Sequence, residues 1–247
     1  MFDQSLRGQH AVVTGASRGI GAAVAAALIQ SGASVTTLQR SEPPRELLGL
    51  AARHETHLKH IAVDLGEAVS IAAAIESAGP ADILVTNAGV QSRYDAAEFP
   101  LSEFERVLDV NTTAVFQLCQ GFGRGMLERG SGKIVALASL LSFQGGLRVP
   151  AYAASKGAVA QLVKALSNEW AGRGINVNAV APGYVETDMN AALIADPDRF
   201  RQLSERIPAG RWATPEDIAS AVAFLCTPYA GYIHGTVLPV DGGWLGR

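Results

Sequence analysis

Short apolar runs alternate with longer segments in which apolar residues recur at helical spacing along the whole chain. The apolar runs predict seven β-strands, at residues 10–14, 34–39, 58–63, 83–86, 133–138, 176–181 and 236–240. Several runs are apolar at nearly every position, which is typical of parallel strands covered on both faces. Helices are predicted between them, at residues 19–31, 45–54, 67–78, 101–128, 151–172, 198–205 and 215–226. The alternation predicts an α/β fold, a doubly wound parallel sheet of seven strands with helices on both faces.

The composition narrows the class of protein further. No Pro/Ser-rich linker or low-complexity stretch interrupts the 247 residues, so a single domain is predicted across residues 1–247. The net charge of -3 gives no electrostatic footprint for nucleic acid or a membrane surface. No apolar run reaches the roughly 20 residues that span a bilayer. The five histidines show no ligand spacing, which argues against a metal site.

The cysteines and the start of the chain indicate where the protein works. Cys119 and Cys226 lie far apart in apolar helical contexts, where reduced core cysteines are expected rather than a disulfide. Residues 1–5 do not resemble a signal peptide, since no basic stretch is followed by an apolar one. A cytoplasmic location is therefore expected.

A glycine-rich turn follows the first predicted strand and opens the first predicted helix. It runs Thr14-Gly15-Ala16-Ser17-Arg18-Gly19-Ile20-Gly21. Glycines let the backbone turn tightly and approach a pyrophosphate, whose charge a helix N-terminus stabilises. The spacing is G-x-x-x-G-x-G rather than G-x-G-x-x-G, so an ordinary glycine-rich turn is an alternative. The strand–turn–helix context favours a dinucleotide site, and with it a Rossmann-type sheet.

Tyr152 and Lys156 are candidates for proton transfer. Residues four apart on a helix share a face, so the Lys156 ammonium can lie near the Tyr152 phenol. A nearby positive charge lowers the pKa of a phenol from its ordinary value of about 10. The phenol could then exchange a proton with a substrate oxygen near neutral pH. A surface tyrosine and lysine that happen to share this spacing are the alternative interpretation.

Ser139 and Asn111 are further candidates. Ser139 ends the apolar run 133–138, where a hydroxyl projects into the ligand crevice of a parallel sheet, unless it is simply a turn residue. Asn111 lies inside the helical pattern 101–128, although asparagine is a poor helix former. It either marks a helix boundary or bends the helix and holds a water.

Together these motifs resemble the short-chain dehydrogenase/reductase family. In chain order they are residues 14–21, Asp64-Leu65, Asn87-Ala88-Gly89, Asn111, Ser139, Tyr152-x-x-x-Lys156 and Pro182-Gly183-x-x-x-Thr187. The match covers essentially the whole chain in the family's order and spacing. It implies an NAD(P)(H)-dependent oxidoreductase that moves a hydride between a nicotinamide and a carbonyl or alcohol carbon of a small molecule. It also implies a homotetramer.

The resemblance assigns a role to each motif. Tyr152 would be the catalytic acid/base, Ser139 would position the reacting oxygen, and Lys156 would lower the phenol's pKa and bond the nicotinamide ribose. Asn111 would hold a water that links Lys156 to solvent. The residues implied to line the cofactor are Gly15, Ser17, Gly19 and Ile20, Asp64 and Leu65, Asn87, Ala88 and Gly89, and Pro182, Gly183, Val185 and Thr187.

The end of the second predicted strand bears on the choice between NAD and NADP. A carboxylate there binds the ribose hydroxyls and repels a 2′-phosphate, whereas an arginine attracts the phosphate. The chain has Gln39 at this place, followed by Arg40, and Arg18 in the glycine loop could add a second cation. NADP(H) or dual use is predicted, with plain surface charges as the alternative for both arginines.

The second half of the chain resembles the branch of the family that acts on sugar acids. Residues 138–152, 168–171, 206–212 and 241–245 are similar to that branch. Arg93 and Arg148 are candidates for binding a substrate carboxylate, with Gln144 also expected at the substrate, and a structural ion pair or subunit contact is the alternative for the arginines. The polar segment 186–211 is interpreted as a substrate lid.

Two other functions are alternatives to the predicted oxidoreductase of sugar acids. A 3-oxoacyl thioester or general ketone reductase fits residues 14–21 and the overall layout equally well. A sensor that binds dinucleotide without turnover belongs to a different class. The set of Asn111, Ser139, Tyr152 and Lys156 argues against the sensor, since a binding module needs no acid/base.

Overall fold

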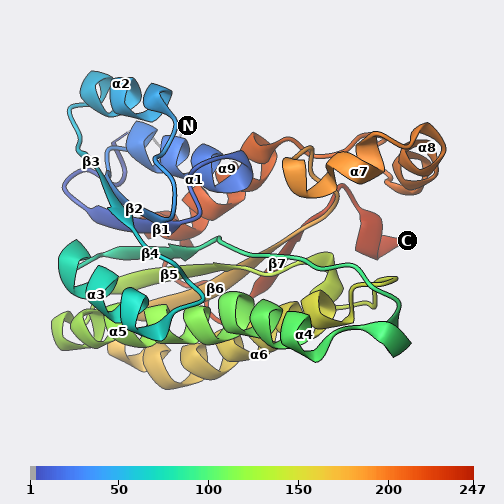
Figure 1. Ribbon diagram of the computed structural model, residues 1–247. Coiled ribbons are helices and arrows are strands. Elements are labelled where there is room, and N and C mark those ends of the chain that lie inside the picture. Colours follow the sequence, from blue (N-terminus) through green and yellow to red (C-terminus); the bar gives the residue numbers. More distant parts are fainter. Residues whose placement is uncertain (1–3) are drawn as a thin grey trace.

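A computed structural model describes residues 4–247, and Met1–Asp3, part of the segment judged unlike a signal peptide, lie outside the described residues. The seven strands form one parallel sheet in the order β3-β2-β1-β4-β5-β6-β7 (Figure 1). The order reverses between β1 and β4, so the predicted doubly wound sheet is confirmed. The strands are β1 His10–Thr14, β2 Ser34–Gln39, β3 Leu58–Ala62, β4 Ile83–Thr86, β5 Gly132–Leu137, β6 Ile175–Pro182 and β7 Val237–Val240.

Helices cover both faces of the sheet in two layers (Figure 1). On one face lie α1 Gly19–Gln30, α2 Arg45–Arg53 and α9 Pro215–Cys226, and on the other α3 Ala68–Ala78, α4 Leu101–Leu108, α5 Ala114–Arg129 and α6 Pro150–Trp170. Each layer closes its own apolar core, because strands apolar at every position bury side chains on both faces. None of the helices in residues 4–247 is long and apolar enough to cross a membrane.

The observed strands and helices follow the predicted ones to within two residues, apart from one helix. Residues 101–129 are helical throughout, but a π-turn at Asp109–Thr113 divides the run into α4 and α5. The prediction missed the π-turn because it adds one residue to a turn and leaves the apolar periodicity almost unchanged. The structure also adds a short helix, α7 Ala191–Ile194, before α8 Pro197–Arg206.

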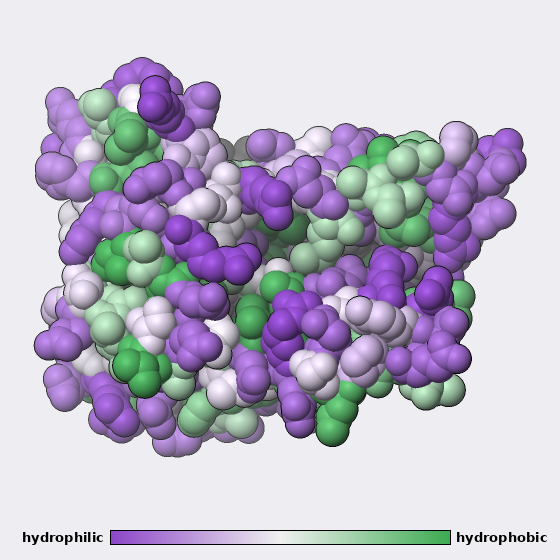
Figure 2. Space-filling view, viewed as in Figure 1, coloured by the Kyte–Doolittle hydropathy of each residue, from purple (hydrophilic) through white to green (hydrophobic). Residues whose placement is uncertain are grey.

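A third apolar cluster lies beyond the carboxyl ends of the strands. It contains Leu140, Leu203, Ile207, Trp212 and Trp244, all buried. These residues come from the segment after β5, from α8 and its continuation, and from the C-terminal turn. The surface is hollowed between the α7–α8 segment and the opposite helix layer (Figure 2). The carboxyl edge, where a doubly wound sheet binds ligands, is thus walled on one side by this cluster.

Candidate active site

The structure brings Tyr152 and Lys156 together on one face of α6. The Lys156 Nζ lies 5.7 Å from the centroid of the Tyr152 ring and donates a hydrogen bond of 2.6 Å to the carbonyl oxygen of Leu137, the last residue of β5. Lys156 is buried and Tyr152 half-buried. The helical spacing therefore places both groups at the carboxyl edge of the sheet, as predicted, rather than on the protein surface.

Ser139 starts the turn that follows β5 and faces Tyr152. Its Oγ accepts a hydrogen bond from the Leu141 backbone N–H at 3.1 Å, and it interacts with the Tyr152 phenol. Ser142 closes the turn: its Oγ accepts from the Ser139 N–H and donates to the Lys156 carbonyl oxygen at 2.7 Å. Ser139 is therefore both a turn residue and a neighbour of the phenol, so the two alternatives for this residue coincide.

Asn111 lies in the π-turn and is fully buried. Its Oδ1 accepts from the Val90 N–H at 2.8 Å, and its Nδ2 donates to the Val90 carbonyl oxygen at 2.9 Å and to the Ser155 Oγ at 3.0 Å. The side chain thus ties the segment after β4 to α6 beside Lys156. Both amide hydrogens are used within the protein. Asn111 thus marks a local change of helix type, and its amide has no hydrogen left to donate to a water.

Burial controls the pKa values of the two proton-transfer candidates. It raises the pKa of Tyr152, and the hydrogen bond with Ser139 only partly opposes this. It lowers the pKa of Lys156 to about 8. The pKa of the phenol is therefore raised overall, opposite to the expected direction, because burial outweighs any lowering by Lys156. The Lys156 ammonium lies against the tyrosine ring and the Leu137 carbonyl, so desolvation of the phenol dominates.

The glycine loop is fastened to the segment that follows β4. Thr14 Oγ1 accepts from the backbone N–H groups of Asn87 and Ala88, both at 3.0 Å, and Asn87 Nδ2 donates to the Gly15 carbonyl oxygen at 3.1 Å. Gly15 has a φ of 69°, and a Cβ there would lie 2.9 Å from the Ala88 Cα. Only glycine fits, since both the conformation and the space exclude a side chain.

The same loop leaves an open cradle suited to a pyrophosphate. Arg18, at the N-cap of α1, makes no side-chain capping bond, and the first turn carries no acidic residue. The helix N-terminus is therefore available to an anion. A Cβ at Gly19 would touch the Thr187 side chain at 3.4 Å, and one at Gly89 would lie 3.7 Å from the Lys156 Nζ. The cradle thus runs from the glycine loop to Lys156, and the residues present fit a dinucleotide.

Gln39 also holds the glycine loop, whereas the sequence indicated only that this position lacks an acid. It is buried at the end of β2, and its Oε1 accepts a hydrogen bond of 2.5 Å from the Ala16 N–H in the glycine loop. Its Nε2 is buried without a hydrogen-bond partner among the described residues. Arg40 is exposed beside it. The end of β2 therefore presents no negative charge to an adenosine ribose.

The other predicted cofactor residues line the same edge, some with structural duties. Asp64 Oδ1 accepts from the Gly66 N–H at 2.9 Å and shapes the turn after β3, where Leu65 packs on the core. Val185 is buried and pairs with Ala213. Asp188, next to Thr187, forms an ion pair of 3.1 Å with Arg18. This pair connects the glycine loop with the 186–211 segment.

Comparisons with known proteins agree with this arrangement. A family model described as Enoyl-(Acyl carrier protein) reductase matches residues 15–245. The 2-dehydro-3-deoxy-D-gluconate 5-dehydrogenases of Pseudoalteromonas atlantica and Bacillus subtilis are 44% and 43% identical to the chain, over 98% of it and 98% and 97% of their own lengths. The chain belongs to the short-chain dehydrogenase/reductase family.

Solved structures of this family match along the entire chain. An Agrobacterium tumefaciens protein named for 2-deoxy-D-gluconate 3-dehydrogenase, crystallised with NADP, is 47% identical with a TM-score of 0.93, covering 100% of this chain and 99% of its own. A gluconate 5-dehydrogenase from Burkholderia cenocepacia, in complex with NADP and tartrate, is 35% identical with a TM-score of 0.92 and the same coverage. The protein is therefore an NAD(P)-dependent oxidoreductase of the short-chain dehydrogenase/reductase family.

Among the predicted substrate residues of this short-chain dehydrogenase/reductase, some are already bonded to other residues of the protein and one has no ion pair within the described residues. Arg148 Nε pairs with Asp95 at 3.0 Å, and the Arg148 carbonyl oxygen accepts from the Tyr94 N–H, so Arg148 joins two loops. Gln144 Oε1 accepts a hydrogen bond of 3.3 Å from Trp244. Arg93 is exposed with no carboxylate within 4.0 Å in residues 4–247. The ion-pair alternative therefore applies to Arg148, and Arg93 stays available.

Proposed function

We propose that the protein interconverts a secondary alcohol and a ketone on a sugar acid of the 2-dehydro-3-deoxy-gluconate or 2-deoxy-gluconate type, with NADP(H) or both cofactors. The observation that carries the proposal is the meeting of Ser139, Tyr152 and Lys156 at the end of the glycine cradle. The names of the similar proteins support the substrate class, because they describe enzymes of 2-dehydro-3-deoxy-gluconate, 2-deoxy-gluconate and gluconate.

In this proposal the protein aims the reaction and moves one proton. A bound nicotinamide supplies the hydride donor or acceptor. The Tyr152 phenol gives its proton to the substrate oxygen during reduction and takes it back during oxidation. Its raised pKa keeps the phenol protonated near neutral pH, which suits the reducing direction. Ser139 donates a hydrogen bond to the same substrate oxygen.

Lys156 and Asn111 support this proton transfer. The buried Lys156 ammonium would bond the nicotinamide ribose of a bound cofactor and would stabilise a phenolate during oxidation. Asn111 positions the segment around Lys156 through its three hydrogen bonds. A water that links Lys156 to solvent would be held by a backbone carbonyl of the π-turn, since the amide hydrogens of Asn111 are already used.

The preference for NADP(H) rests on the charges around the adenosine ribose. Gln39 ends β2 without a carboxylate, and the exposed Arg18 and Arg40 can attract a 2′-phosphate. The remaining cradle residues would be Gly15, Ser17, Gly19 and Ile20, Asp64 and Leu65, Asn87 to Gly89, and Pro182, Gly183, Val185 and Thr187. Two similar proteins crystallised with NADP support this choice.

The proposal includes a lid, an assembly and a location. The 186–211 segment, which contains α7 and α8, would close over the substrate. Exposed apolar side chains such as Leu101, Phe116 and Tyr232 are 69%, 44% and 99% accessible, which supports a homotetramer. Two buried free cysteines fit a reducing cytoplasm. Light scattering of the purified protein tests the tetramer.

A substrate panel with both cofactors tests the proposed function. We expect turnover of 2-dehydro-3-deoxy-gluconate or gluconate derivatives, with kcat/KM at least tenfold above that for simple ketones and 3-oxoacyl thioesters. The thioesters are included because the matching family model is described as an Enoyl-(Acyl carrier protein) reductase. A higher kcat/KM for a thioester than for every sugar acid would replace the proposal with the acyl reductase alternative.

A further inference from the structure

An aromatic cluster occupies the substrate end of the cleft, where the chemistry so far described uses none of its members. Tyr184 lies with its ring centroid 5.1 Å from that of Trp212 and 4.9 Å from that of Trp244, and Phe200 stacks on Trp212 at 5.1 Å. Leu140, which follows Ser139 directly, packs in the same cluster. Tyr184 itself follows Pro182-Gly183 at the end of β6. The cluster thus adjoins the turn that carries Ser139.

Arginines from separate parts of the chain act electrostatically on Tyr184, and one of them, Arg206, lies over its neighbour Trp244. The Arg206 guanidinium, on α8, lies 3.9 Å from the centroid of the Trp244 ring, which in turn contacts Tyr184. Burial raises the pKa of the Tyr184 phenol, and the positive charges of Arg199, Arg206 and Arg93 act on it in the opposite direction. Arg93 comes from the segment after β4. Positive charge from both walls of the cleft therefore reaches one half-buried hydroxyl.

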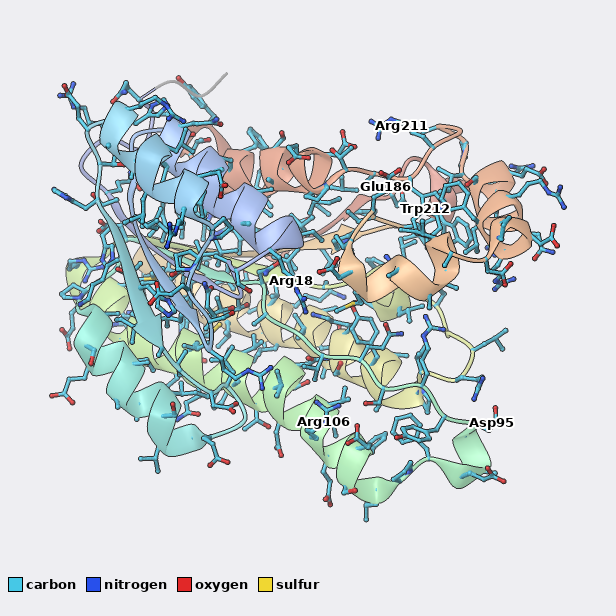
Figure 3. All side chains as sticks on the ribbon, turned by 45° about the horizontal axis from the view of Figure 1, so that its top comes forward. Arg18, Asp95, Arg106, Glu186, Arg211 and Trp212 are labelled. Carbon is cyan, nitrogen blue, oxygen red and sulfur yellow. The ribbon has the colours of Figure 1, made fainter. Side chains whose placement is uncertain are left out.

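These three arginines differ from their neighbours in having no acidic partner. Within residues 4–247, no carboxylate lies within 4.0 Å of the guanidinium of Arg93, Arg199 or Arg206. On the same stretch, Arg201 pairs with Asp198 at 2.8 Å and Arg211 with Asp217 at 2.6 Å. Glu186, near Trp212 in Figure 3, acts on Arg211, and Asp95 lies toward the opposite helix layer. An uncompensated group of cations at a ligand cleft suits an anion.

We propose that Tyr184 and Arg206, with Arg93 across the cleft, bind the carboxylate of the substrate. The assignment rests on the proposed sugar-acid function and names the residues that would select for an acid. Stacking on Trp244 holds the Arg206 guanidinium in one plane, so its fork can bind a carboxylate in a bidentate manner. The Tyr184 hydroxyl can donate a further hydrogen bond. Arg148, neutralised by Asp95, is left out of the anchor.

The test compares acid and neutral substrates in matched variants. For Arg206→Gln we expect KM for the sugar acid to rise about 10- to 100-fold, the loss of a charge-assisted hydrogen bond. Tyr184→Phe keeps the ring and should raise KM about fivefold. For a neutral polyol of the same length, KM and kcat should change less than twofold in both variants. Arg201→Gln, on the same helix but already paired, is the control and should leave KM for the acid unchanged.

Arg206→Lys guards against a purely structural effect, because lysine keeps the charge and can still cover Trp244. It should recover part of the affinity for the acid, and all variants should keep the thermal midpoint of the wild type within about 3 °C. KM values for the acid that shift no more than in Arg201→Gln, or that shift equally for the neutral polyol, would overturn the anchor.

Binding of L-tartrate separates this proposal from the proposed function. Tartrate is a small hydroxy acid, and Trp212 and Trp244 provide a fluorescence signal beside the anchor. With cofactor present, the wild type should bind tartrate and Arg206→Gln should bind it at least tenfold more weakly. If no sugar acid is turned over but this difference persists, the function fails and the anchor stands. Equal binding of tartrate by both proteins, or none by the wild type, overturns the anchor.

Discussion

The cleft has a cofactor wall, formed by the glycine loop and the segment after β4, and a substrate wall, formed by the 186–211 segment and the aromatic cluster around Tyr184. The two walls are held by different kinds of interaction. On the cofactor side, Gly15 and Gly19 have positive φ angles and the loop is bonded through Thr14, Asn87 and Gln39 at distances of 3.1 Å or less. On the substrate side, the 186–211 segment meets the rest of the protein mainly through side chains: Phe200 stacks on Trp212, Arg206 lies over Trp244, and Asp188 pairs with Arg18. Backbone hydrogen bonds to Ala213 and Gly242 add to these contacts. Backbone geometry allows almost no substitution, whereas side chains on the 186–211 segment can be exchanged singly.

The difference explains how one fold serves many substrates. A dinucleotide presents the same pyrophosphate to each family member, so its cradle can be built from backbone atoms that no side-chain change alters. A substrate varies, and its contacts come from loops positioned by a rigid scaffold. Tyr152 and Lys156 stand between the walls, on α6.

The largest expected effect comes from Tyr152, the proposed proton-transfer group between the two walls. Tyr152→Phe should lower kcat by about 10²–10⁴-fold, because the ring remains but the substrate oxygen has no proton donor. The dissociation constant of NADPH, measured by fluorescence, should change less than threefold. Turnover at the wild-type rate would show that another group transfers the proton.

On the cofactor wall, the addition of a single methyl group should lower both the stability of the protein and its affinity for the cofactor. Gly15→Ala places a Cβ 2.9 Å from the Ala88 Cα at a φ of 69°, and it should destabilise the protein by about 1–3 kcal/mol. NADPH affinity should fall at least tenfold, measured by titration. Gly172→Ala, where a Cβ meets nothing within 4 Å, is the control and should change the free energy of unfolding by no more than about 0.5 kcal/mol.

The pH dependence of the reducing reaction tests whether the buried cation belongs to the cofactor wall. The pKa of Lys156 is lowered to about 8, so the amine is charged below that pH and neutral above it. kcat/KM for NADPH should therefore fall as pH rises through about 8, by about tenfold per unit at the steepest. The Tyr152 phenol, with its raised pKa, stays protonated over the same range. In Lys156→Arg the alkaline fall should disappear; its persistence would assign it to another group.

The sequence predicts the cofactor wall better than the substrate wall. The alternation of strands and helices, the glycine loop and the meeting of Ser139, Tyr152 and Lys156 follow from local patterns, because each motif sits within one strand–turn–helix unit. The π-turn at Asn111 was missed as a separate element because it leaves the apolar periodicity intact. Their chemical roles stay predictions.

The substrate wall was harder to predict because its contacts join distant residues. Arg148 satisfies its charge with Asp95, and the Arg206–Trp244 contact joins α8 to the C-terminal turn. The pKa of Tyr152 was predicted in the wrong direction for a related reason. The charge four residues away was visible in the sequence, but the burial that outweighs it depends on the whole fold.

The smallest expected effect lies at an ion pair that connects the walls. Arg18 in the glycine loop pairs with Asp188 in the 186–211 segment at 3.1 Å, and both side chains are more than two-thirds exposed. If Arg18 also attracts the 2′-phosphate, Asp188 competes with the cofactor. Asp188→Asn should then tighten NADPH binding about two- to fivefold and leave NADH binding unchanged, as expected for a solvent-exposed pair. Asp198→Asn, which removes the partner of Arg201 further along the 186–211 segment, is the matched control. A gain in NADPH affinity that vanishes at 0.5 M salt would sharpen the comparison, because screening weakens exposed pairs most. An equal gain for NADH would place the effect in lid opening rather than at the phosphate.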